Sequence, residues 1–264
     1  MITLTEKEIL SNWEELRGII NNTFEGDRLE NLNKMYDYFE DRMVLAPASG
    51  KEHFHYAMVG GYVAHVLHVV GFAVQLKDLW EKNGGKIDFT DEELIFSAMH
   101  HDLGKVGDLH NDYYVPQESD WHRKNKGEIY THNGDLNYMT VTDRAVFLLG
   151  HFNIPMSELE YLGLRLTDGL YEQGNESYLK SYFPQNNLKS NIAYILHQAD
   201  MMATHIEFNE WERSNNASNK RVQQSVDKIK QATKTTTNKF ISSDSKGENA
   251  KDLFDELFGE KKWY

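Results

Sequence analysis

The stretch that decides the fold is Ala98-Met99-His100-His101-Asp102-Leu103-Gly104-Lys105, in which an apolar segment ends at a glycine followed by a lysine. We expect a buried helix to end there. His101 and Asp102 set an imidazole beside a carboxylate, and both groups are ligands for divalent metal ions. The second oxygen of that carboxylate can reach another cation. The pair alone is weak evidence in a chain with 12 histidines, so its significance depends on residues elsewhere.

Two other apolar segments carry residues that suit the same site. His65 lies in segment 60–70, where apolar residues recur at helical spacing, and it is predicted to face the core. Asp200 is the one acid in the apolar segment 192–203. A buried carboxylate needs a cation or hydrogen bonds to offset its desolvation. With two histidines that lie between these segments, the ordered series is His65, His101, Asp102, His132, His151 and Asp200.

This series resembles the metal-binding pattern of the HD-domain metal-dependent phosphohydrolase superfamily. The resemblance extends over about residues 45–205 and is carried by segments 57–65, 101–105 and 197–203. The region that ends at His65 is similar to the His-x-Ala-x-x-Gly-Gly-x-x-x-His stretch of the HD domain in bacterial 3′-to-5′ exoribonucleases. The resemblance implies that a first metal is bound by His65, His101, Asp102 and Asp200. It also implies a second metal, bridged by Asp102 and held by His132 and His151.

The same resemblance implies an activity. It is hydrolysis of a nucleotide or other small phosphoester, as a phosphomonoesterase or phosphodiesterase, by a metal-activated water. Asp102 and Lys105 are the catalytic candidates, with Lys105 contacting a phosphoryl oxygen; alternatively, Lys105 is an ordinary cation at a helix end. Two other functions stay open: an HD-type di-iron oxygenase with identical ligands, and a non-catalytic nucleotide-sensing or scaffold module.

Candidate substrate contacts lie mainly in segment 106–133, which interleaves aromatic and cationic residues. Such a mixture can stack on a base and pair with phosphate, or it can be a surface loop whose aromatic residues pack on the bundle. A second irregular segment, 167–175, is predicted to form another wall. The candidates are His55, Lys105, Trp121, His122, Arg123, Tyr130, Tyr171 and Asn175.

The composition favours an all-α fold. Only four prolines occur in 264 residues, long segments show helical periodicity, and we find no alternating strand pattern. We therefore predict a helical bundle of the HD-domain type with metal between facing helices. Residues 1–44 should form N-terminal helices packed on the core, and 45–210 the HD domain. Residues 211–264 should form a polar extension with a short amphipathic terminal helix; its Leu-Phe pairs in 252–260 should pack on this domain or bind a protein partner.

Charge and cysteine content narrow the chemistry. Without cysteine, no thiolate can bind metal, so one or two divalent ions are expected on imidazole and carboxylate, with Fe, Mn, Co or Ni favoured and Mg acceptable. The net charge of −13 argues against long duplex nucleic acid and fits a small phosphorylated substrate, such as a nucleotide, held locally. No segment is predicted to span a membrane or to act as a signal peptide. We expect a cytoplasmic protein, in the host cytoplasm if the chain is viral.

Overall fold

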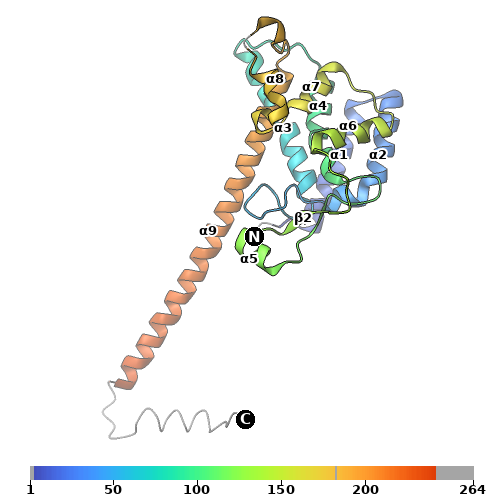
Figure 1. The fold of residues 1–264 in the computed structure, drawn as a ribbon. Helices are drawn as coiled ribbons and strands as arrows, with labels where there is room; N and C mark the ends of the chain where they lie inside the picture. Colours follow the sequence, from blue (N-terminus) through green and yellow to red (C-terminus); the bar gives the residue numbers. More distant parts are fainter. Residues whose placement is uncertain (1–2, 182, 242–264) are drawn as a thin grey trace. The chain divides into compact units, whose positions relative to one another are not determined.

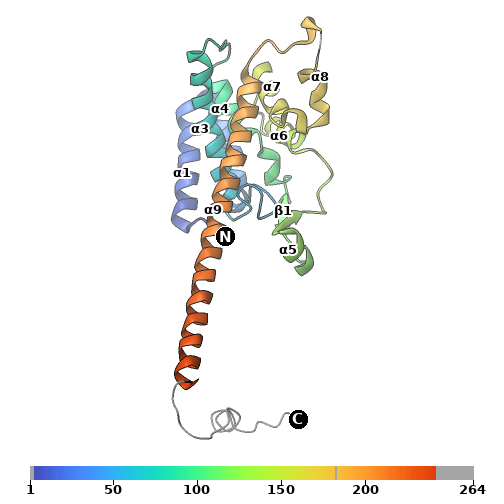
Figure 2. The ribbon, with the colours of Figure 1, turned by 90° about the vertical axis from the view of Figure 1, so that its left-hand side faces the viewer.

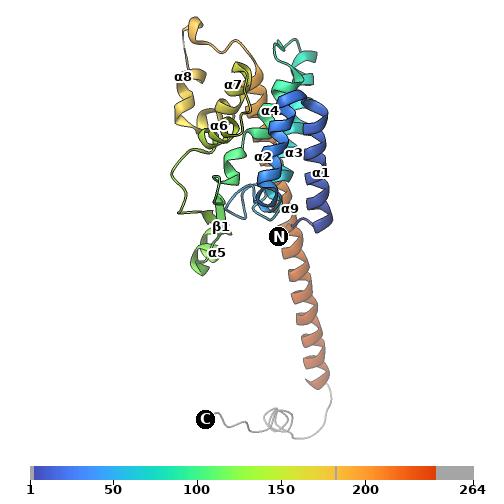
Figure 3. The same ribbon diagram turned by 90° about the vertical axis from the view of Figure 1, so that its right-hand side faces the viewer.

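The fold is predominantly α-helical, which confirms the predicted all-α class. The structure, a computed structural model, describes residues 3–181 and 183–241, with residues 217–241 as backbone only. Figures 1, 2 and 3 show the arrangement from three sides. The α-helices are α1 (Glu6–Thr23), α2 (Gly26–Leu45), α3 (Gly61–Lys82), α4 (Asp91–His100), α5 (Asp120–Lys126), α6 (Val141–His151), α7 (Glu158–Leu166), α8 (Glu176–Leu179) and α9 (Ile192–Ile241). The 3₁₀ helices are η1 (Leu103–Val106), η2 (Gly169–Tyr171), η3 (Gln173–Asn175) and η4 (Pro184–Asn186), and the strands are β1 (Tyr114–Pro116) and β2 (Tyr130–His132).

Side-chain caps begin several of these helices. Thr5 and Thr90 each form a capping box with the glutamate three residues later, at the starts of α1 and α4. Ser157 caps α7 in the same way. Each box satisfies backbone N–H groups that the first helical turn leaves unpaired. These local signals fix where the helices begin, and the apolar face of each helix then determines how it packs.

The core lies between two groups of helices. Helix α3 packs on α1, α2 and α4, and α4 packs on α7. In Figure 3, α6, α7 and α8 lie on the left and α1 on the right, with α2, α3 and α4 between them. Nearly every residue in the first half of α3 is buried, including Tyr62 and Val66, whose side chains are at most 1% exposed. The first half of α3 therefore lies in the interior of the bundle, and His65 belongs to it.

Segment 106–133 is partly ordered into secondary structure, which the sequence analysis did not predict. Strands β1 and β2 pair antiparallel, with Tyr114 opposite His132 and Pro116 opposite Tyr130. Three-residue strands are too short to show alternation, and α5 between them has no buried side chain and so no apolar period. The carbonyl oxygen of Gly50 accepts hydrogen bonds from the backbone N–H groups of Ile129 and Tyr130. This small hairpin is thereby attached to the loop that precedes α3.

The chain divides into two compact units, Met1–Ser214 and Asn215–Tyr264. The two N-terminal helices belong to the first unit, together with the region predicted as the HD domain. The predicted terminal helix around 252–260 lies outside the described residues. None of the helices described has an apolar stretch long enough to cross a membrane.

A glycine substitution tests how closely α6 packs on η1. A Cβ atom at Gly104 would collide with the backbone carbonyl of Val141, whereas a Cβ at Gly71, in the interior of α3, would meet nothing within 4 Å. We expect Gly104→Ala to lower the free energy of unfolding by roughly 1–3 kcal/mol. Gly71→Ala should raise it by about 0.5–1 kcal/mol through helix propensity. Urea denaturation of both variants checks this; equal effects would show that Gly104 is not a packing constraint.

Candidate metal centre

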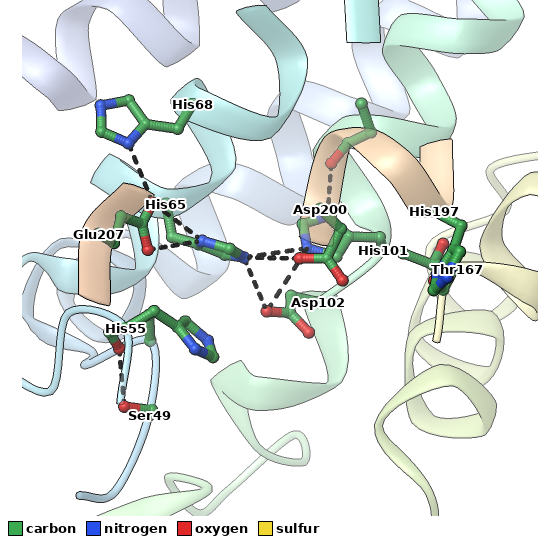
Figure 4. A network of polar contacts seen from close by, with 12 residues as sticks. Ser49, His55, His65, His68, His101, Asp102, Thr167, His197, Asp200 and Glu207 are labelled. Carbon is green, nitrogen blue, oxygen red and sulfur yellow. Dashed lines mark hydrogen bonds and ion pairs between the residues drawn. The ribbon is translucent and has the colours of Figure 1, made fainter. Parts of the chain in front are cut away.

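Three helices bring four of the predicted ligands together, as Figure 4 shows. His65 comes from the first half of α3, His101 and Asp102 follow the end of α4, and Asp200 comes from α9. The Nε2 atom of His65 lies 3.3 Å from Oδ1 of Asp200, 3.7 Å from Oδ2 of Asp102 and 3.4 Å from Nε2 of His101. We call these four residues the His–Asp cluster. His65 and His101 are buried, and the side chains of Asp102 and Asp200 are 13% and 21% exposed.

The hydrogen bonds of the two imidazoles show that the cluster suits a cation. Nδ1 of His101 lies 2.7 Å from the carbonyl oxygen of Ala98, and Nδ1 of His65 lies 3.0 Å from a Glu207 carboxylate oxygen. Each Nδ1 must therefore carry the proton and donate it, which leaves a lone pair on each Nε2 in the neutral ring. Two lone pairs 3.4 Å apart, between two carboxylates, repel one another unless positive charge lies among them. His65, His101 and Asp200 form a group that could hold a metal ion.

Glu207 is a residue of the candidate centre that the sequence analysis missed. Its side chain is fully buried, and it accepts hydrogen bonds from Nδ1 of both His65 and His68. A carboxylate behind a ligating histidine fixes the ring and its tautomer, and makes the other nitrogen a better ligand. Residues 200, 203 and 207 share one face of α9 by helical spacing. That spacing could have revealed Glu207, since it places a second acid on the face that carries Asp200.

Lys105 and His55 lie beside the cluster. Nζ of Lys105 lies 2.6 Å from Oδ2 of Asp102, 2.9 Å from the carbonyl oxygen of Ala48 and 3.5 Å from Nε2 of His55. Burial and the nearby ammonium lower the pKa of His55 to about 3, so this ring is neutral. His55, His65 and Asp102 form a second group that could hold a metal ion. Since His65 has a single free nitrogen, both groups describe one centre, with His55 at its edge.

The other two predicted metal ligands lie elsewhere. His132 is exposed on β2, with its ring against Tyr113 and Tyr114. His151 is exposed at the end of α6, beside Phe147 and Phe152. Neither histidine belongs to a candidate metal group, although both are among the residues that the structure describes. Their role as ligands was predicted only from their position between the other ligands in the sequence. Sequence order does not determine the direction of a side chain at the end of a strand or helix.

A pocket of about 360 Å³ opens beside the cluster. We call it the hairpin pocket, because β1, β2 and the loop before α3 form its walls. It is lined by Ser49, Gly50, Lys51, Phe54, His55, Lys105, Tyr114, Glu128, Tyr130, Thr131 and His132. Lys105 and His55 connect the pocket to the cluster. Lys105 donates a hydrogen bond to Asp102, and His55 forms a candidate metal group with His65 and Asp102. A neighbouring hollow of about 230 Å³ shares Lys105, Tyr114 and Tyr130.

The predicted substrate contacts divide accordingly. His55, Lys105 and Tyr130 line the hairpin pocket. Trp121, His122 and Arg123 lie on α5 and do not line it: the Trp121 ring lies under the ammonium of Lys126, His122 contacts Ser119, and Arg123 pairs with Asp120.

The candidates from segment 167–175 also lie outside the hairpin pocket. Tyr171 is 83% exposed at the rim of a separate, largely apolar pocket of about 450 Å³. Asn175 is fully buried and bonds to Arg165 and to the carbonyl oxygen of Gly169. That bonding shows a structural role for Asn175, because its side-chain amide is already occupied.

The same segment carries a more relevant residue, Asp168, which the sequence analysis did not single out. Desolvation of its carboxyl group, followed by the negative charges of Asp102 and Asp200, raises its pKa. The charges of Asp102 and Asp200 therefore act on this carboxyl group, although Asp168 as a whole is exposed to solvent. A carboxyl group in this position retains a proton more readily than an ordinary aspartate.

The pKa values predict how the stability of the metal-free protein depends on pH. Burial lowers the pKa of His65, but the carboxylates of Glu207 and Asp200 outweigh it and raise that pKa from 6.5 to about 10. This contribution to stability is complete below about pH 6.5 and is lost as the pH rises toward 10. Burial raises the pKa of Glu207, but His65 and His68 outweigh it and lower that pKa from 4.5 to about 2. This second contribution is complete above about pH 4.5 and is lost as the pH falls toward 2.

Metal-free protein should therefore be most stable between about pH 4.5 and pH 6.5, as measured by urea unfolding across the pH range. In Glu207→Gln the loss of stability above this window should be smaller, because the partner that raises the pKa of His65 has gone. A wild-type profile that is flat from pH 6.5 to pH 10 would contradict the assigned His65–Glu207 ion pair.

Glu207 can also be tested through metal binding. We expect Glu207→Gln to weaken the affinity for Mn²⁺ by roughly 10- to 100-fold, because the ligating ring of His65 loses its charged partner. Glu210→Gln is the matched control: Glu210 is on the same helix and accepts a hydrogen bond from Tyr56 rather than from a ligand. Competition with a chromogenic chelator measures both affinities. Equal affinities in the two variants would remove Glu207 from the centre.

Comparison with known proteins found no similar protein. The chain matches no protein-family model, no curated protein and no solved structure. What can be concluded about the centre therefore comes from its own geometry: four facing ligands on three helices, a buried carboxylate behind one of them, and a lysine-lined pocket beside them.

Proposed function

We propose that this protein is a metal-dependent phosphohydrolase of the HD-domain type, acting on a small phosphoester such as a nucleotide. The observation that carries the proposal is the pair of facing imidazole nitrogens, His65 Nε2 and His101 Nε2, set between the carboxylates of Asp102 and Asp200. Imidazole and carboxylate donors suit Mn, Fe, Co or Ni, and Mg to a lesser degree. The hairpin pocket supports the assignment, because it brings a cationic side chain to the edge of the same centre.

A divalent cation bound by these four residues would polarise a phosphoryl oxygen and lower the pKa of a coordinated water. The chain's own residues supply the remaining functions. Lys105 pairs with Asp102 at 2.6 Å, beside the proposed metal position. Its ammonium group would stabilise the negative charge that develops on the phosphoryl oxygens. Burial opposes the charged form of Lys105, but Asp102 outweighs this and raises its pKa, so the side chain is an ammonium at all relevant pH values.

Two further residues contribute to the proposed reaction. Glu207 holds the His65 ring with its free nitrogen toward the centre. In this proposal Asp168, whose carboxyl pKa is raised by desolvation and by the charges of Asp102 and Asp200, would hold a proton and release it to a leaving oxygen. Hydrolysis is favoured over the di-iron oxygenase, since the two histidines expected to hold a second iron, His132 and His151, lie outside the described metal groups.

The proposal is tested by measuring phosphate or nucleotide release from a panel of nucleotides and short single strands with Mn²⁺ present. Asp102→Ala should lower the rate roughly 100-fold or more, because it removes a ligand and the partner of Lys105. The matched control is His151→Ala, which alters an exposed histidine beside two phenylalanines. It should keep both the metal content and the rate of the wild type.

Two outcomes would contradict the proposal in different ways. No release by the metal-loaded wild-type protein from any member of the panel would overturn the assignment as a phosphohydrolase. Loss of metal and activity in His151→Ala would show instead that the centre includes the second pair of histidines predicted from the sequence.

A further inference from the structure

The hairpin pocket contains hydrogen-bond donors that the fold itself does not use. Tyr114 and Tyr130 line it, and among the hydrogen bonds of the described residues none involves either phenol hydroxyl. Other tyrosine hydroxyls do have partners: Tyr36 contacts His100, and Tyr56 donates to Glu210. Neither phenol oxygen is among the buried polar atoms that lack a partner, so both hydroxyl groups are accessible to solvent. Burial raises the pKa of both phenols, and each therefore remains an O–H donor.

A cation without a carboxylate partner lies in the same pocket. Lys51 makes no ion pair with any described residue, and its ammonium lies 5.4 Å from the centroid of the Phe54 ring. Its backbone is bridged to Glu128, whose carboxylate accepts a hydrogen bond from the Gln117 amide. The chain has 41 acidic residues against 28 basic ones. Other lysines of the described residues also lack an ion pair, so what distinguishes Lys51 is its place in the lining of a pocket that Lys105 lines as well. Two ammonium groups at one pocket suit an anionic ligand.

We propose that the hairpin pocket binds a second phosphate group of the substrate, linked to the phosphate held at the His–Asp cluster, through Lys51, Tyr114 and Tyr130. This inference rests on the proposed function for the position of the first phosphate. Lys105 lies between the two positions, since it contacts Asp102 and lines the pocket. Hydrogen bonds from an ammonium or hydroxyl to a phosphate oxygen are among the stronger ones in proteins.

The charges of the lining favour an anion over a neutral group. Among the charged side chains that line the pocket, the two ammonium groups of Lys51 and Lys105 outnumber the single carboxylate, that of Glu128, which already accepts a hydrogen bond from Gln117. A base alone would stack on the rings but would leave Lys51 without a counter-charge. The volume of about 360 Å³ accommodates a phosphate with the sugar attached to it.

Equilibrium binding separates this inference from the proposed activity. The metal-loaded full chain is titrated by calorimetry with three ligands that cannot be hydrolysed. They are a nucleoside phosphonate, the corresponding nucleoside methylene-bisphosphonate, and a dinucleotide whose two phosphates are replaced by phosphonates. We expect one of the two ligands that carry two phosphonate groups to bind at least roughly tenfold more tightly than the monophosphonate. Preference for the bisphosphonate identifies a polyphosphate chain, and preference for the dinucleotide identifies a strand.

The variants decide whether the pocket is responsible. Lys51→Met with Tyr114→Phe and Tyr130→Phe should abolish the preference while leaving the affinity for the monophosphonate unchanged, because the rings and their packing remain. The matched control is Lys86→Met with Tyr138→Phe: Lys86 pairs with Asp88, and Tyr138 is 95% exposed. An equal preference in both sets of variants, or none in the wild type, overturns the inference. A pocket-dependent preference without any hydrolysis would overturn the proposed function alone.

Discussion

The arrangement of the bundle depends on one electrostatic requirement: two imidazole lone pairs and two carboxylates must face one another in a mostly buried space. Their distances of 3.3–3.8 Å are repulsive in pairs unless a proton or a metal ion lies among them. The ligands come from α3, from the end of α4 and from α9, so the three helices must pack in one register for the cluster to form. The apolar core around α3 supplies that register, and Glu207 secures the ring at its centre.

The sequence was most informative where residue type and surroundings agreed. His65, His101, Asp102 and Asp200 were predictable because each is a polar ligand inside an apolar helical segment, where an unpaired polar group is costly. The all-α fold followed from similarly local signals, the recurrence of apolar residues at helical spacing and the scarcity of proline. Tertiary contacts confirm only what such signals imply: that these side chains face inward.

What escaped prediction depends on contacts between distant segments. Glu207 is 142 residues from the ring that it holds, and only its helical spacing from Asp200 distinguishes it from the other acids of α9. His132 has the right residue type for a ligand, but its strand pairing with Tyr114 directs it to the hairpin pocket. Strands of three residues give no alternation to recognise, and the attachment of the hairpin to Gly50 uses backbone groups only.

Because the hairpin is attached through backbone groups, the side chains of the pocket and the ligands of the cluster tolerate substitution to different degrees. The hairpin is held by backbone hydrogen bonds to Gly50 and by the bridge between Lys51 and Glu128, neither of which requires particular side chains at Tyr114, Thr131 or His132. Substitutions at those pocket positions leave the frame of the pocket in place, whereas the ligands of the cluster are interdependent. Selection could therefore retune what the pocket accepts while the centre stays constant, so ligand preference should diverge faster than chemistry among descendants of this chain.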